Sequence, residues 1–119
     1  MAVIAVVDDE DSVRRSMQRL LRAAGYDVAL YADGPQFLES LERQPLACAI
    51  VDGHMPGMHG REVLAALAER EPRIPAIVVT GQDSPEYRQS AAAYGASAFF
   101  SKPFDPEALL AAVAAAVGR

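Results

Sequence analysis

The sequence contains little cysteine, no tryptophan and no excess of positive charge. Its single cysteine, Cys48, excludes an internal disulfide, which suits a reducing compartment. The formal net charge of -5 provides no basic surface for nucleic acid or for an anionic membrane. No apolar run is long enough to span a bilayer, and the first residues lack the basic segment of a signal peptide. We therefore expect a cytoplasmic protein that does not itself bind nucleic acid or membranes.

The remaining composition is that of a folded domain. Hydrophobic residues make up 51% of the sequence, which is too many for a disordered chain. The 119 residues are enough for one hydrophobic core. We predict a single domain over residues 1–119, in which Cys48 is a small buried hydrophobe.

Short apolar segments alternate along the chain with segments of helical periodicity. The predicted strands are 2–7, 26–31, 46–51, 75–79 and 97–100. The predicted helices are 13–24, 33–43, 60–70, 84–95 and 105–119. An alternation of this kind forms a parallel sheet with helices on both faces, and right-handed crossovers leave few topologies for it. The sequence therefore predicts an α/β fold.

The segment 84–95 is the least strongly patterned of the predicted helices. It begins with Ser-Pro-Glu and stops at Gly95, but its apolar face is mostly alanine. Alanine buries little surface, so this helix is expected to be held weakly and to move easily.

Polar side chains follow four of the five predicted strands. The acidic stretch 8–10 follows the first strand, Asp52 the third, Thr80 the fourth and Lys102 the fifth. Ligands of open α/β sheets bind beyond the carboxyl ends of the strands. We therefore expect these carboxylates, the hydroxyl and the ammonium group to gather on one edge of the sheet.

Each of these residues also has an ordinary structural explanation. Asp9 or Asp11 could cap the first helix, and Asp52 could belong to a turn. Thr80 could simply end a strand, and Lys102 could be a solvated surface charge. The set is harder to explain in this way, because the predicted fold places its members together.

Taken together, the carboxylates, the hydroxyl and the ammonium group at the strand ends favour phosphoryl chemistry. Carboxylates that lie close together repel one another unless a cation neutralises them, and a few oxygen ligands with room for water suit Mg²⁺ or Mn²⁺. A divalent cation beside a lysine and a hydroxyl can bind a phosphoryl group. An aspartate at such a metal can be the nucleophile and form an acyl phosphate.

Four ordered motifs, VVDDE, VDGHMPGMHG, VVTG and FFSKPF, resemble those of response-regulator receiver domains of two-component signalling. The resemblance covers essentially the whole chain, and it is greatest with the FixJ-type transcriptional regulators. It implies a CheY-like, doubly wound fold with strand order 2-1-3-4-5.

The resemblance also implies a metal site and a phosphoacceptor. Asp52 matches the phosphoacceptor, and Asp9 matches the direct acidic ligand of Mg²⁺. Asp8 matches the neighbouring acid that acts through a metal-bound water. The position of His54 would supply a backbone carbonyl to the metal.

The catalytic and switch residues follow from the same resemblance. Lys102 matches the lysine that pairs with a phosphoryl oxygen, and Thr80 matches the hydroxyl that moves to the phosphoryl group. Phe99 matches the aromatic residue that changes rotamer together with that hydroxyl. The peptide bond between Lys102 and Pro103 is expected to be cis, a form whose free-energy cost is small only before proline.

Several positions depart from the commonest pattern of the family. Gly53 replaces a bulkier apolar residue, and Phe99 replaces a tyrosine. His54 and Gln82 occupy the positions whose side chains tune the lifetime of the aspartyl phosphate. His59 is expected on an exposed turn. A transition-metal site through the ring of His54 is disfavoured, because no further histidine or cysteine is placed to complete it.

The resemblance implies a sensor histidine kinase or phosphotransfer protein as the phosphoryl donor. It favours a receiver that controls transcription through a DNA-binding output domain beyond this chain, with a stand-alone receiver as the alternative, and it allows a homodimer that depends on phosphorylation. Two alternatives stay open. One is a small Mg²⁺-dependent phosphohydrolase, although haloacid-dehalogenase-type enzymes require an aspartate where this chain has His54. The other is an interaction module that works without phosphorylation.

Overall fold

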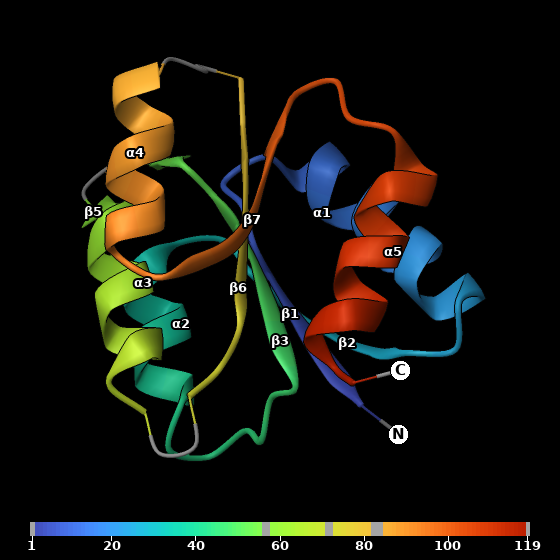
Figure 1. Ribbon diagram of the computed structural model, residues 1–119. Coiled ribbons are helices and arrows are strands. Elements are labelled where there is room, and N and C mark those ends of the chain that lie inside the picture. Colours follow the sequence, from blue (N-terminus) through green and yellow to red (C-terminus); the bar gives the residue numbers. More distant parts are fainter. Residues whose placement is uncertain (1, 56–57, 71–72, 82–84, 119) are drawn as a thin grey trace.

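A computed structural model describes residues 2–55, 58–70, 73–81 and 85–118 (Figure 1). Its long strands are β1 (Val3–Val7), β2 (Asp27–Tyr31), β3 (Cys48–Asp52), β6 (Ala76–Thr80) and β7 (Ala96–Ser101). Its short strands are β4 (His54–Met55) and β5 (Met58–His59). Its helices are α1 (Asp11–Ala23), α2 (Gly34–Ser40), α3 (Gly60–Ala68), α4 (Pro85–Ala93) and α5 (Pro106–Ala116).

The five long strands form one parallel sheet in the order β2-β1-β3-β6-β7. Counted among the long strands alone, this is the predicted order 2-1-3-4-5, which is confirmed. The three central strands are β1, β3 and β6, and their sequences are short β-branched runs suited to burial on both faces. The predicted functional residues at the ends of these strands are therefore neighbours in space.

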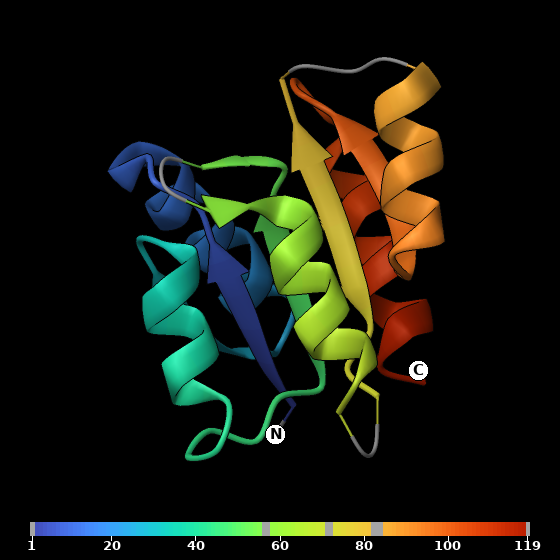
Figure 2. The ribbon, with the colours of Figure 1, turned by 90° about the vertical axis from the view of Figure 1, so that its left-hand side faces the viewer.

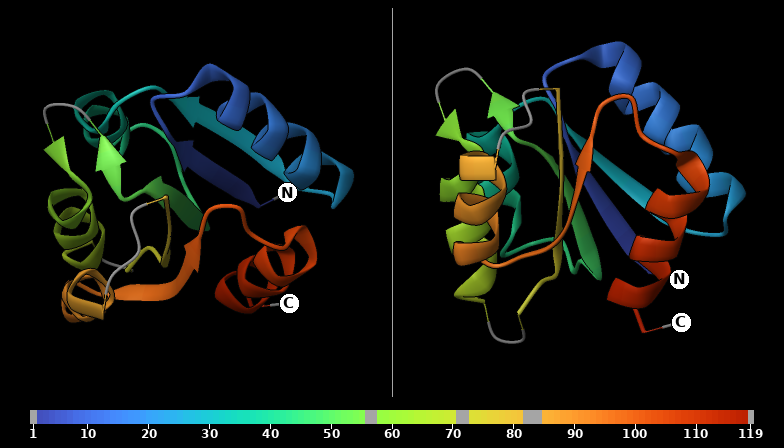
Figure 3. Two further views of the ribbon diagram at one scale, coloured as in Figure 1. Left: turned by 90° about the horizontal axis from the view of Figure 1, so that it is seen from above. Right: turned by 45° about the horizontal axis from the view of Figure 1, so that its top comes forward.

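Helices cover both faces of the sheet (Figures 1 and 3). Helices α1 and α5 pack on one face, where Met17, Leu21, Leu109 and Val113 are buried. Helices α2, α3 and α4 pack on the other. There the buried helix residues are Phe37, Val63, Leu64, Leu67 and Ala91. The sheet thus separates two hydrophobic cores.

Local signals explain where several helices begin and end. The side chain of Asp33 caps α2 by accepting a hydrogen bond from the amide of Gln36, at 2.8 Å. Asp105 caps α5 through the amide of Glu107, at 3.1 Å. Gly25 follows α1 with φ of 95°, a left-handed conformation in which glycine commonly ends helices.

All five helices end one to three residues earlier than the sequence predicts, and the difference is largest for α2 and α5. Helix α2 ends at Ser40 and not at residue 43, and the chain continues as turns toward Pro45, whose preceding residue is disfavoured in a helix. Helix α5 ends at Ala116 and not at residue 119, because Gly118 has a φ of 81°. Gly118 was a stop signal in the sequence that the predicted end of α5 did not use.

The segment after β3 contains a feature that the sequence analysis missed. The two-residue strands β4 and β5 pair antiparallel, with His54 opposite His59 and Met55 opposite Met58. His59 was expected on an exposed turn before α3, and its backbone belongs instead to this small ribbon. Runs of two residues carry too little pattern to be recognised in a sequence.

Helix α4 lies along β7 at one edge of the molecule (Figure 2). Among the side chains of α4 that the structure describes, Ala91 is the buried one. This observation agrees with the weak apolar face predicted for 84–95. No helix within the described ranges is long and apolar enough to cross a membrane.

Candidate functional site

The carboxyl ends of the central strands bring three buried polar residues together. Asp8 follows β1, Asp52 ends β3 and Thr80 ends β6, with exposed fractions of 4%, 6% and 0%. The strand register places Val7 opposite Val51 and Asp52 opposite Val79. Asp8, Asp52 and Thr80 are consequently side by side across adjacent strands, as the sequence predicts.

The loop after β1 carries a cluster of carboxylates. Oxygen atoms of Asp8, Asp9 and Glu10 all lie within 4.8 Å of one another. Glu10 is the residue that precedes α1, yet its side chain makes no capping hydrogen bond. The alternative in which Asp9 or Asp11 caps this helix is therefore not the arrangement observed. Glu10 was given no site role in the sequence analysis, although its place in the acidic stretch was visible.

Hydrogen bonds fix the shape of this acidic loop. The amide of Glu10 donates to Oδ1 of Asp8 at 2.9 Å. Arg14, one turn into α1, donates from Nη1 to the backbone carbonyl of Asp8 at 2.6 Å and from Nη2 to Asp11 at 3.2 Å. The sequence analysis did not identify Arg14. Only its spacing of three residues from Asp11, which brings the two side chains together on a helix, could have indicated it.

Lys102 reaches into the site from the end of β7. Its Nζ lies 3.2 Å from Oδ2 of Asp8 and 3.7 Å from Oδ1 of Asp52. Its backbone amide donates to the carbonyl of Thr80 at 2.7 Å. The peptide bond between Lys102 and Pro103 is cis, so that prediction is confirmed.

The charge of Lys102 is stabilised by its neighbours. Burial disfavours the ammonium form, but attraction to Asp52 and Asp8 outweighs burial and raises the pKa of Lys102 above its ordinary 10.5. The side chain is 23% exposed, so solvent weakens this attraction only in part. At neutral pH Lys102 is a fixed positive charge beside the two carboxylates.

The donor set fits a small divalent cation. Carboxylate oxygens within a few ångströms of each other repel unless a cation lies among them, and hard oxygen ligands suit Mg²⁺. The neighbouring lysine supplies one positive charge against several negative ones. The site therefore retains an excess of negative charge for a metal ion to neutralise.

Two predicted site residues are described only in part. The backbone of His54 lies in β4, two residues after Asp52, where its carbonyl was expected to serve the metal. Gln82 lies outside the described residues. The proposed effect of both side chains on phosphate lifetime stays a prediction.

Phe99 lies in β7 on the side of the sheet that α4 covers. Its ring is half-buried against the core beneath α4. The guanidinium carbon of Arg88, from α4, lies 4.7 Å from the centre of this ring. The same side chain approaches the hydroxyl of Ser101 at 3.4 Å. The predicted switch aromatic is thus in contact with a helix that the sequence marks as movable.

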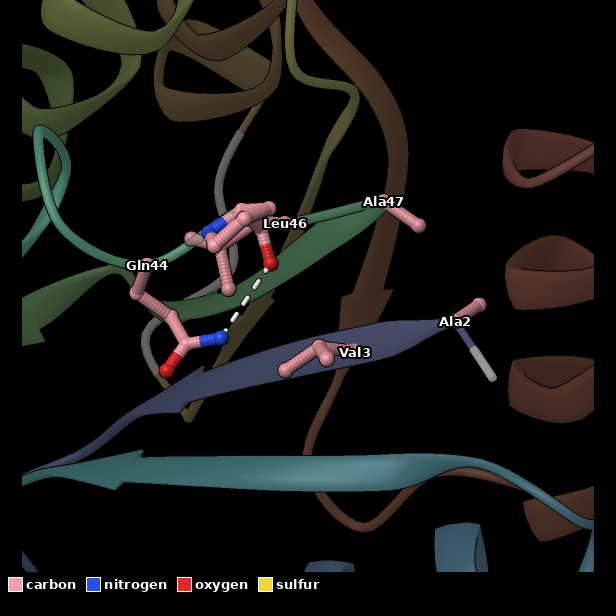
Figure 4. A pocket seen from close by; sticks show the side chains of 6 residues that line it. Ala2, Val3, Gln44, Leu46 and Ala47 are labelled. Atoms are coloured by element: carbon pink, nitrogen blue, oxygen red, sulfur yellow. Dashed lines mark hydrogen bonds between the residues drawn. The ribbon is translucent and has the colours of Figure 1, made fainter.

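Two other features lie apart from these residues. Burial raises the pKa of Cys48 to about 12, so its thiol is a protonated core group and not a nucleophile. A hollow at the opposite, amino-terminal edge of the sheet is lined by Ala2, Val3, Gln44, Pro45, Leu46 and Ala47. Within it Gln44 donates to the carbonyl of Pro45 at 3.3 Å (Figure 4). None of these lining side chains is charged, so the hollow offers none of the chemistry found at the carboxyl edge.

Comparison with known proteins agrees with this geometry. The family model of the response regulator receiver domain matches residues 4–114. The transcriptional regulatory protein FixJ of Azorhizobium caulinodans is 36% identical over 98% of this chain and 55% of its own length. Nodulation protein W of Bradyrhizobium diazoefficiens is 35% identical over 99% of this chain and 52% of its own length. The chain spans about half the length of these curated relatives.

Solved structures agree as well. The chemotaxis protein CheY4 of Vibrio cholerae superposes with a TM-score of 0.89 and 34% identity, over 98% of each chain. The family match covers nearly all of the sequence, and the strand order, the buried acids and the lysine stand where the motifs predicted them. The chain belongs to the response-regulator receiver domains of two-component signalling.

Proposed function

We propose that this domain accepts a phosphoryl group on Asp52 and changes conformation in response. The observation that carries the proposal is a buried carboxylate, Asp52, that ends β3 beside Lys102 and the acidic loop after β1. A carboxylate that is buried beside a lysine and further acids is costly to place in the interior, which favours a functional role.

The transfer is an in-line displacement at phosphorus. An oxygen of Asp52 attacks the phosphoryl group of a phosphohistidine, the phosphorus–nitrogen bond breaks, and an aspartyl phosphate forms. Lys102 pairs with a phosphoryl oxygen and stabilises its negative charge. The hydroxyl of Thr80 donates a hydrogen bond to another phosphoryl oxygen.

Receiver domains generally bind Mg²⁺ at an acidic pocket. In this chain the carboxylates of Asp9 and Asp52 and the carbonyl of His54 would hold the ion, and Asp8 would act through a water molecule. Mg²⁺, or Mn²⁺ in its place, supplies positive charge against the phosphoryl oxygens. Glu10 lies within the same carboxylate cluster and adds negative charge beside the metal.

The conformational response begins at Thr80. When its hydroxyl moves to the phosphoryl group, Phe99 turns into the space beside it. The surface formed by α4, β7 and α5 then presents a different shape. This is a two-state equilibrium that phosphorylation biases, and a near-complete shift requires about 5 kcal/mol of differential stabilisation.

The partners follow from the family and from the curated relatives. The phosphoryl donor is a sensor histidine kinase or a phosphotransfer protein. One of the named relatives, FixJ, is a transcriptional regulatory protein, and both named relatives are about twice as long as this chain. We place this chain, as domain 1–119, in a regulator whose DNA-binding part lies beyond it, with a homodimer forming through the switch surface after phosphorylation.

The test is a phosphorylation assay with acetyl phosphate and Mg²⁺, read by intact mass and by size-exclusion chromatography. We expect the wild-type chain to gain the mass of one phosphoryl group. Asp52→Asn should gain none, while Asp27→Asn, an exposed acid at the start of β2, should behave as the wild type. A phosphoryl group gained by Asp52→Asn would contradict the assignment of the acceptor.

The same assay separates the alternatives. Steady hydrolysis of a generic phosphate ester over many turnovers would favour a phosphohydrolase. No mass gain in the wild type would favour an interaction module that works without phosphorylation. We expect neither, because the domain catalyses only its own phosphorylation and dephosphorylation.

A further inference from the structure

Arg88 connects the movable helix to the switch residue. It lies on α4, and its guanidinium stands 4.7 Å from the centre of the Phe99 ring in β7. Its Nη2 also lies 3.4 Å from Oγ of Ser101, the residue before Lys102. One exposed side chain on the helix thus touches two positions on the strand that leads into the site.

This contact is important because few of the described side chains of α4 bury apolar surface. Ala91 is the buried residue among the α4 side chains that the structure describes, and alanine contributes little apolar area. A guanidinium over an aromatic ring is attracted by the ring's quadrupole and also covers its apolar face. Arg88 therefore adds to the attachment of α4 to β7 at the ring of Phe99 and at Ser101.

We propose that Arg88 is a positioning residue that holds Phe99 in the conformation of the phosphate-free domain. Contact with Arg88 stabilises the ring where it now stands, between α4 and the core. A ring that turns toward Thr80 leaves the guanidinium, so the contact opposes the switch. The inference rests on the proposed function, because it concerns the equilibrium that phosphorylation of Asp52 biases.

Thermodynamic linkage makes the inference measurable. If phosphorylation favours the state in which the contact is broken, then breaking the contact must favour binding of a phosphoryl mimic by the same factor. An exposed cation–π contact is equivalent to a change of about two- to fivefold in an equilibrium constant.

The experiment measures the affinity of the full chain for beryllofluoride in the presence of Mg²⁺. We expect Arg88→Ala to bind about two- to fivefold more tightly than the wild type. Arg88→Gln, which keeps a long polar side chain, should show the same direction. Arg43→Ala is the matched control, because it removes an exposed arginine from the turn after α2, next to the hollow at the opposite edge.

A double-mutant cycle assigns the effect to the ring. The Arg88→Ala effect should disappear in a Phe99→Leu background and persist in a Phe99→Tyr background, which keeps the aromatic face. Amide hydrogen exchange in α4 and β7 of the phosphate-free chain should accelerate in Arg88→Ala by a similar factor.

The outcomes separate a failure of the proposed function from a failure of the role proposed for Arg88. A wild type that does not bind beryllofluoride would overturn the proposed function and this inference together. A wild type that binds it, with Arg88→Ala binding equally or more weakly, would overturn the role of Arg88 alone. An Arg88→Ala effect that persists in the Phe99→Leu background would show that Arg88 acts through another neighbour, and would also reject the inference.

Discussion

Lys102 forms an ion pair with Asp8, whose Oδ2 lies 3.2 Å from its Nζ, although the two residues follow strands that are not neighbours in the sheet. Lys102 follows the edge strand β7, whereas Asp8 follows β1, and β3 and β6 lie between them. The side chain therefore extends across the ends of the intervening strands, past Asp52. The position of this ammonium group sets the electrostatics of the whole edge.

The first prediction concerns the pKa of Lys102, the single lysine of the sequence. Burial lowers this pKa, but Asp52 and Asp8 raise it by more, so the folded value lies above the ordinary 10.5. The charge therefore contributes stability below pH 10.5, and this contribution is lost as the pH rises through the folded pKa. Isotope-labelled lysine should give one NMR signal that titrates above 10.5.

The controls for this titration are single carboxylate changes. Asp52→Asn removes the largest attractive contribution and should lower the pKa of Lys102. Asp27→Asn, at the other edge of the sheet, should leave it unchanged. A lysine signal that titrates below 10.5 in the wild type would contradict the predicted balance.

The second prediction concerns stabilisation by Mg²⁺. A cation that binds the folded site and not the unfolded chain adds about 2.7 kcal/mol at a free concentration of 100 times its dissociation constant. We expect Mg²⁺ to raise the Tm of the wild type by several degrees. Asp9→Asn should lose most of this rise, and Asp27→Asn should keep it. Equal rises in all three proteins would place the bound cation elsewhere.

The third prediction compares two adjacent arginines of α1. Arg14 is 16% exposed and donates to the carbonyl of Asp8, whereas Arg15 is 71% exposed and pairs only at the surface with Asp11. Arg14→Ala should lower the free energy of unfolding by about 1–2 kcal/mol, because the Asp8 carbonyl loses a charged hydrogen bond. Arg15→Ala should cost about 0–0.5 kcal/mol, as exposed ion pairs do.

The same pair of variants tests whether Arg14 orients the acidic loop. Arg14→Ala should also weaken Mg²⁺ binding, measured by calorimetry, while Arg15→Ala should not. If both variants bound Mg²⁺ with the affinity of the wild type, the contact of Arg14 would be purely structural.

The fourth prediction concerns the lifetime of the aspartyl phosphate. The side chains at positions 54 and 82 are expected to border the path of the attacking water. His54→Ala and Gln82→Ala should each change the half-life of the phosphorylated form, followed by intact mass after the donor is removed. Unchanged dephosphorylation rates in both variants would reject this role.

The fifth prediction concerns Gly95, which follows α4. Its φ is +101°, and an added Cβ would stand 2.9 Å from Nη2 of Arg73. Gly95→Ala should therefore lower the free energy of unfolding by about 1–2 kcal/mol, through backbone strain. Gly81→Ala meets nothing within 4 Å and should cost less in chemical denaturation. Equal costs at both positions would show that the strain at Gly95 is relieved elsewhere.

The sequence predicted the sheet and its functional edge well, for a physical reason. Buried parallel strands require uninterrupted β-branched runs, and those runs stop where a carboxylate or a hydroxyl begins, as at Asp52 and Thr80. Strand order then followed from handed crossovers and from the family resemblance. The grouping of Asp8, Asp52 and Lys102 needed no further information.

The contacts of Arg14 and Arg88 could not be predicted in the same way. Both depend on how far a helix is translated and rotated against the sheet, and hydrophobic periodicity does not specify these values to within a hydrogen-bond length. The β4–β5 ribbon was missed because its strands are two residues long. The end of α5 was overestimated because the prediction did not use Gly118 as a stop signal.

The division of the interior by the sheet has a mechanical consequence. Among the residues that the structure describes, the core under α1 and α5 has no side chain in common with the core under α2, α3 and α4. Contacts between α4 and its own core can therefore change without a direct change in the core under α1 and α5. In the proposed switch, the core under α1 and α5 would keep the sheet assembled while contacts on the α4 side rearrange, so switching would not require global unfolding.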